Sequence, residues 1–194
     1  MNPARSTALG RSAAVAGIGA TIQRLLQRPA AKAVLFVTCL MPFAWLFYGA
    51  WADRLGANPA ETLIRNTGDW VLRFLCLTLA VTPLRQLSGW HALARFRRML
   101  GLFSFFYLVL HFLTWLGIDQ SFNARNVVID IAKRPYVTVG FTALLLLIPL
   151  AVTSTDRWMR RLGRRWQTLH RLIYPAALLG CLHFLWLVKA DWRE

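Results

Sequence analysis

Residues 100–118 read LGLFSFFYLVLHFLTWLGI, a stretch without a charged side chain and with a single histidine, His111. An apolar run of about 20 residues is long enough to cross the hydrocarbon core of a bilayer as an α-helix. Four similar runs occur elsewhere, and none shows the alternating pattern of a membrane β-strand. They cover residues 33–51, 70–87, 136–154 and 169–188. The sequence therefore predicts an all-α integral membrane protein, a bundle of about five transmembrane helices.

The basic residues predict the orientation of this bundle. The chain is 57% hydrophobic, yet its formal net charge is +15. Fifteen of its 23 lysines and arginines lie before the first run or in and immediately beside the two loops on that same side, seven lie on the other side, and Arg73 lies within a run. Because basic loops stay in the cytoplasm, we expect a cytoplasmic N-terminus in a bacterial inner membrane. Because the basic residues are divided among separate loops at the membrane, we expect them to contact anionic lipid rather than nucleic acid.

Three segments follow from this topology. We expect a basic cytoplasmic tail over residues 1–32, lying at the membrane surface or without fixed structure. Residues 33–188 form the predicted transmembrane domain, and residues 189–194 form a short periplasmic end. No internal repeat is visible in the sequence.

Several kinds of active site are excluded. Acidic residues are few and lie in loops, so the sequence predicts no paired-carboxylate catalysis, and it has no glycine-rich phosphate loop or serine elbow. Cys39, Cys76 and Cys181 lie inside predicted spans without CxxC or CxxCH spacing, as expected of small packing residues. We therefore predict no catalytic residue in this chain.

The histidines are the residues most indicative of function. His91 falls in a predicted cytoplasmic loop, where solvation explains it. His111 lies deep in its span, His170 opens the last span, and His183 lies in the outer half of that span. Ionisable side chains at membrane depth indicate function by default, although a neutral histidine bonded to another helix is the structural alternative.

Helix geometry decides which histidines can act together. At 1.5 Å per residue, His170 and His183 lie about 20 Å apart along one helix and cannot bind the same iron atom. His111 and His183 lie within about 4 Å of the same depth, whereas His111 and His170 differ by about 15 Å. His111 and His183 are therefore the predicted axial ligands of one haem. Without CxxCH that haem is b-type, and two imidazole ligands favour electron transfer over oxygen chemistry.

Two further residues have open interpretations. Arg73, near the outer end of its span, either pairs with the haem propionates or extends to the interface. His170 either binds an inner haem with an unknown partner or caps the start of its helix. Arg98 occupies the position where a second pair would need its other histidine.

Several motifs in a fixed order lead to a family resemblance. They are LGANPAE, TGDWVLRFLCLTLAVTPL, RRMLGLFSFFYLVLH, RPYVTVG, TSTDRWMRRLGRRWQTLHRLIYP and HFLWLVK. Over residues 35–188 the chain resembles the haem-binding membrane subunit of the periplasmic protein-methionine-sulfoxide reductase system, within the ferric-reductase-like transmembrane group. The family's haem ligands fall on His111 and His183, and its further histidine falls on His170.

The resemblance implies an electron-transfer subunit rather than a catalytic one. It implies a periplasmic molybdenum-cofactor (molybdopterin) reductase as partner, which repairs methionine sulfoxide in envelope proteins. It also implies the quinone pool or a cytoplasmic flavin reductase as electron donor, and bound FMN. Family members continue into a sixth span, whereas this sequence stops at Glu194, and a flavin or quinone site on that span is then in question.

Two other functions compete with this one. The first is a transmembrane ferric or metal reductase with a different acceptor, which normally has a fused cytoplasmic flavin domain. The second is a small transporter or assembly factor whose histidines bind substrate or metal. An absorption spectrum separates them, because reduced haem b has a sharp α-band and a transporter has none.

Overall fold

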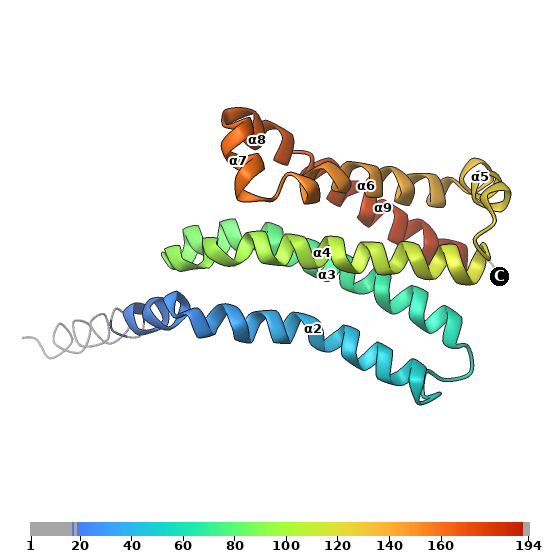
Figure 1. Cartoon of the computed structure of the whole chain (residues 1–194), viewed down its shortest axis with the longest axis horizontal. Coiled ribbons are helices and arrows are strands. Elements are labelled where there is room, and N and C mark those ends of the chain that lie inside the picture. The colour runs from blue at the N-terminus through green and yellow to red at the C-terminus, as the bar shows by residue number, and fades with distance from the viewer. Residues whose placement is uncertain (1–16, 18, 192–194) are drawn as a thin grey trace, which may run out of the picture.

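The computed structural model describes residue 17 and residues 19–191, and every regular element in this part of the chain is a helix (Figure 1). The elements are α2 (Pro29–Trp51), α3 (Pro59–Ser88), η1 (His91–Leu93), α4 (Ala94–Thr114), η2 (Trp115–Asp119), α5 (Ala124–Lys133), α6 (Pro135–Val152), α7 (Asp156–Leu162), α8 (Arg164–His170) and α9 (Ile173–Asp191). Five helical stretches are long and apolar enough to cross a membrane: Pro29–Trp51, Pro59–Ser88, His91–Asp119, Pro135–Val152 and Arg164–Lys189. The prediction of an all-α membrane bundle with five spans is confirmed.

Proline and glycine set several helix ends. Pro29, Pro59 and Pro135 occupy the first turns of α2, α3 and α6, where a missing backbone N–H costs nothing because that group has no partner inside the helix. The α3 helix ends at Gly89, whose φ of 71° is left-handed and therefore suits glycine. The first span begins at Pro29 rather than at the predicted residue 33, because the helix includes the two alanines and Lys32 that precede the apolar run.

Part of the predicted N-terminal tail is ordered helix. Residues 19–27 are helical and precede α2 directly. The guanidinium of Arg95, at the start of α4, donates to the backbone carbonyls of Leu26, at 2.9 Å, and of Gln27. These bonds tie the segment to the transmembrane bundle. The rest of the predicted tail, residues 1–16 and 18, and the end of the chain, residues 192–194, lie outside the described residues.

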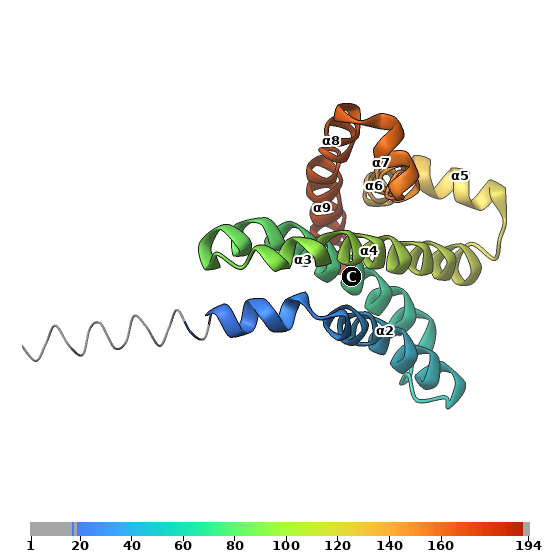
Figure 2. The same ribbon diagram turned by 60° about the vertical axis from the view of Figure 1, so that its left-hand side comes forward.

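The bundle consists of two helix hairpins with a fifth helix beside them. The most extensive packing is between α3 and α4 and between α6 and α9, and the hairpins meet through α3 with α9 and α4 with α6. The α2 helix lies on the far side of the α3–α4 hairpin from α6 and α9 (Figures 1 and 2). We call one end of the bundle, which carries α5 and the α2–α3 connection, the α5 end. The opposite end, with α7 and α8, is the α7–α8 end.

A buried tyrosine attaches α2 to the rest of the bundle. Tyr107 of α4 has no solvent exposure, and its hydroxyl donates to the carbonyl of Cys39 and accepts from the backbone N–H of Phe43, both at 2.9 Å. In an uninterrupted α-helix those two backbone groups would bond to each other. The hydroxyl is therefore inserted into the hydrogen-bond ladder of α2, beside Pro42, which has no N–H to contribute.

We predict that Tyr107→Phe destabilises the protein by about 1 kcal/mol, because both hydrogen bonds to α2 are lost and the two backbone groups must bond again directly. Thermal unfolding of the detergent-purified protein measures this loss. The matched control is Tyr48→Phe, at an exposed tyrosine of α2, which should leave the unfolding temperature unchanged. Equal unfolding temperatures for the two variants would contradict the attachment.

Candidate functional site

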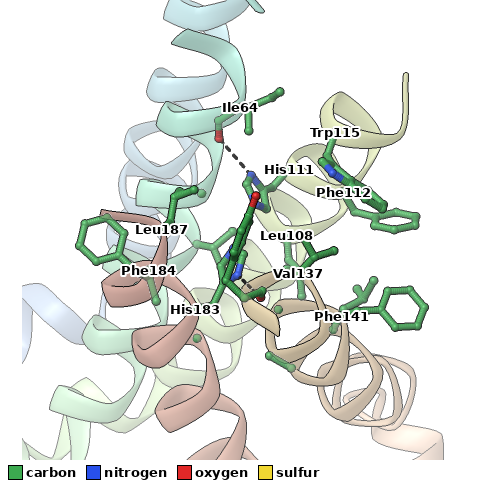
Figure 3. Close-up of a pocket in the computed structure, with 18 of the residues that line it drawn as sticks. Ile64, Leu108, His111, Phe112, Trp115, Val137, Phe141, His183, Phe184 and Leu187 are labelled. Carbon is green, nitrogen blue, oxygen red and sulfur yellow. Dashed lines mark hydrogen bonds between the residues drawn. The ribbon is translucent and has the colours of Figure 1, made fainter. Parts of the chain in front are cut away.

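The structure brings His111 of α4 and His183 of α9 together. Their ring centres are 6.3 Å apart and their ring planes are inclined by 70°. Both side chains line a cavity of about 400 Å³ between the two hairpins (Figure 3). These are the two histidines that the depth estimate paired, and they come from helices of different hairpins.

A backbone carbonyl holds each of the two rings. The Nδ1 atom of His111 lies 3.0 Å from the carbonyl oxygen of Ile64, and Nδ1 of His183 lies 2.7 Å from that of Tyr136 (Figure 3). A carbonyl oxygen only accepts hydrogen bonds, so each Nδ1 carries the proton and donates it. Each Nε2 then keeps its lone pair, which is the form of imidazole that binds a metal.

The two histidine arrangements are equivalent. In both cases the accepting carbonyl lies 47 residues before the histidine, and in both it belongs to the first helix of the hairpin. A glycine follows each carbonyl by one helical turn, Gly68 in α3 and Gly140 in α6. The two hairpins therefore share one local arrangement of histidine, carbonyl and glycine.

The glycines make room for the rings. A Cβ atom at Gly140 would lie 2.8 Å from Nδ1 of His183, and one at Gly68 would lie 3.1 Å from Cε1 of His111. The first distance is too short for any real Cβ contact, and the second is tighter than ordinary packing. Only glycine lets each ring approach the helix closely enough to reach the carbonyl one turn earlier.

The cavity is apolar along most of its length and charged at one end. Its charged and phenolic lining residues are Arg65, Asp69, Asp119, Arg134 and Tyr136. These residues lie where α3 and α6 begin and where η2 ends, which is the α5 end of the bundle. Beyond the histidine pair the lining consists of apolar side chains and glycines. The site can therefore hold a largely apolar group that has a polar edge.

The spacing of the histidines fits an iron atom between them. Two imidazoles on opposite sides of one iron, each bonded through nitrogen at about 2.0 Å, put the ring centres roughly 6 Å apart. The observed separation is 6.3 Å. No group of three or more His, Cys, Asp and Glu side chains suited to a metal ion occurs in the described residues. Two imidazoles alone suit a metal whose remaining ligands come from a cofactor such as porphyrin.

The other predicted site residues lie elsewhere. Arg73 is not among the residues that line the cavity; its guanidinium lies 3.6 Å from Asp69, which does line it, and 4.6 Å from the centre of the Trp70 ring. His170 lies at the α7–α8 end, where Nε2 is 3.1 Å from the hydroxyl of Thr153 and the ring stacks on Trp166 with 3.9 Å between centres. The structure does not bring either residue to the histidine pair.

Sequence reasoning did not find the supporting residues. Gly68 and Gly140 stand at the same chain distance from His111 and His183, respectively, and that equal spacing was a readable signal. The accepting carbonyls of Ile64 and Tyr136 had no such signal, because every residue has a carbonyl and only tertiary packing selects two of them.

The fold and site define a class of protein: a multi-pass helical membrane protein with paired histidines facing one internal cavity. Residues 67–181 match the family described as ferric reductase like transmembrane component. The chain is 57% identical over 166 residues to the protein-methionine-sulfoxide reductase heme-binding subunit MsrQ of Polaromonas naphthalenivorans, covering 85% of this chain and 76% of that protein. It is 56% identical over 157 residues to the protein of the same name from Herminiimonas arsenicoxydans, covering 80% and 72%.

The chain therefore belongs to the ferric reductase-like transmembrane family and, within it, to the group of these methionine-sulfoxide reductase subunits. The family resemblance inferred from the sequence motifs is confirmed.

Gly140→Ala should destabilise the protein by about 1 kcal/mol, the difference between an overpacking cost and a gain in helix propensity. Replacing a helical glycine by alanine normally gains about 1 kcal/mol, but here the new methyl group would overlap the His183 ring, and overpacking costs about 1–3 kcal/mol. The control is Gly101→Ala in α4, whose nearest neighbour is a methyl carbon of Thr78 at 3.6 Å, so that this variant should gain stability. Thermal unfolding measures both, and a stabilised Gly140→Ala protein would show that the ring has other room.

Proposed function

We propose that this chain is a haem b electron-transfer subunit, which carries electrons across the bacterial inner membrane to a periplasmic methionine-sulfoxide reductase. The observation that carries the proposal is the facing pair His111 and His183, each protonated at Nδ1 and each keeping the Nε2 lone pair. The relatives support it, because their names describe heme-binding subunits of a protein-methionine-sulfoxide reductase.

The roles of the residues around the pair follow from their positions. Haem b with two imidazole ligands supplies one-electron transfer and leaves no open position at the iron for a substrate. His111 and His183 would hold the iron, and the carbonyls of Ile64 and Tyr136 fix the orientation of both rings. The mostly apolar lining suits the apolar macrocycle of such a group.

The direction of transfer depends on the orientation of the bundle. We propose that the N-terminus, residues 1–32 and the α7–α8 end are cytoplasmic, while the α5 end and residues 189–194 are periplasmic. The support is the distribution of lysine and arginine, fifteen against seven. The charged end of the cavity, at the α5 end, then faces the periplasmic side.

The electron donor and acceptor are proposed from the family resemblance. The acceptor is a periplasmic subunit with a molybdenum (molybdopterin) cofactor, which repairs oxidised methionine in envelope proteins. The donor is the quinone pool or a cytoplasmic flavin reductase, with FMN as an intermediate carrier. The chain itself is the electron-transfer subunit and not the catalytic one.

The histidine pair provides the main test. His111→Ala and His183→Ala should each remove most of the haem while the protein still inserts, because a haem that is not covalently bound is retained by its axial bonds. The measurement is haem per protein, with the reduced α-band, on purified protein. His91→Ala is the control and should retain full haem, since His91 is exposed on η1. A full low-spin spectrum in either pair variant would overturn the assignment.

His170→Ala separates the two interpretations of His170. A loss of about half the haem would establish an inner haem at that residue. Full haem with slower reduction from the cytoplasmic side would instead support a role in helix packing or donor contact, which its contacts to Thr153 and Trp166 favour.

Reporter fusions test the orientation. A reporter fused after Arg165 should be active only in its cytoplasmic form, and one fused after Arg193 only in its periplasmic form, because the basic loops hold the α7–α8 end inside. Activity of the two fusions measures this directly. The reverse pattern would overturn the proposed direction of electron flow.

A further inference from the structure

The two arginines of the cavity flank it from opposite hairpins. Arg65 belongs to α3 and directly follows Ile64, whose carbonyl binds His111. Arg134 immediately precedes α6, two residues before Tyr136, whose carbonyl binds His183. Each arginine therefore stands next to the residue that orients one of the histidines, and both line the α5 end of the cavity.

Haem has the same division of polarity as the cavity. Its macrocycle is apolar, and its two carboxylates project from one edge. A carboxylate placed in a largely apolar site requires charged or hydrogen-bonding partners, and arginine matches its geometry best. We propose that Arg65 and Arg134 bind the two carboxylates of the haem, which fixes the carboxylate edge toward the α5 end. This proposal rests on the proposed haem-binding function.

Each of these two arginines already pairs with a carboxylate. Arg65 pairs with Glu61 at 2.7 Å and Arg134 with Asp130 at 3.1 Å, in each case one helical turn away. Both arginine side chains are about half exposed, and an ion pair with an exposed carboxylate, such as that of Arg65 with Glu61, contributes little to stability. A guanidinium has five N–H donors, so an added carboxylate can be bound beside the existing one.

The phenol of Tyr136 links Arg134 to the histidine site. Its hydroxyl lies 3.2 Å from Nη1 of Arg134, while its backbone carbonyl accepts from His183. The position of Arg134 is thereby coupled to that of the axial ligand. The acidic residues at this end are also accounted for, because Asp69 lies beside Arg73 and Asp119 interacts with Arg134.

This assignment differs from the expectation that Arg73 pairs with a propionate. Arg73 lies on the same helix as Arg65 but outside the cavity lining, against Asp69 and the Trp70 ring. Arg73→Gln is therefore the control, since it removes the same charge from α3 at a residue that does not itself line the cavity.

The experiment compares two probes on the full-length protein, purified without haem. Haemin carries both carboxylates, and iron protoporphyrin dimethyl ester carries neither charge. Wild type should bind haemin about tenfold or more tightly than the ester. Arg65→Gln and Arg134→Gln should each weaken haemin binding about tenfold, leave ester binding unchanged, and alter the midpoint potential of the bound haem. Arg73→Gln should behave as wild type with both probes.

The ester also reports on folding. A variant that binds the ester as wild type does is folded, so its loss of haemin affinity is assigned to the carboxylates. Equal affinity of wild type for haemin and ester would overturn the proposal, as would haemin loss in Arg73→Gln with none in Arg65→Gln and Arg134→Gln. Failure of the haem function itself is distinct, because wild type would then bind neither probe, and His111→Ala would change nothing.

Discussion

The site depends on one constraint, which is that a polar ring nitrogen inside a membrane must find its partner within the protein. His111 and His183 meet it in the same way, by donating Nδ1–H to a carbonyl of the neighbouring helix. That carbonyl already serves its own helix, so the ring has to come close to the backbone. Glycine one turn later, at Gly68 and Gly140, is what permits the approach. The tautomer, the ring orientation and the close contact within each hairpin all follow from this arrangement.

Because the arrangement occurs twice, the site is built from two similar halves. Each hairpin contributes one histidine, one accepting carbonyl and one glycine, and the cavity forms where the hairpins meet. A single hairpin supplies one imidazole and part of the cavity lining, so both hairpins are needed to bring two histidines together. The two arginines at the charged end of the cavity are not equivalent, because Arg65 lies within α3 while Arg134 lies in the connection from α5 to α6. Both arginines nevertheless lie at the α5 end, so the cavity has one polar end.

The parts outside the two hairpins have different physical roles. The α2 helix contributes nothing to the cavity lining and is attached through the hydroxyl of Tyr107, whose insertion replaces a backbone bond beside Pro42. At the α7–α8 end, Trp166 stacks on the ring of His170, and the hydroxyl of Thr153 lies within hydrogen-bond distance of its Nε2. These contacts place His170 in the packing between the end of α6 and α8. The Arg95 bonds to residues 26 and 27 likewise tie the helical N-terminal segment to the bundle.

The sequence by itself determined the membrane class, the five spans and the pairing of His111 with His183, because span length and helix rise are fixed by bilayer thickness and backbone geometry. Those quantities are one-dimensional and can be read along the chain. Which side of a helix faces its neighbour cannot be read along the chain in this way, because it depends on how the two helices are rotated against each other. Only the tertiary structure therefore decided that Arg65 and Arg134, and not Arg73, line the cavity, that two particular carbonyls hold the rings, and that residues 19–27 continue the helical bundle.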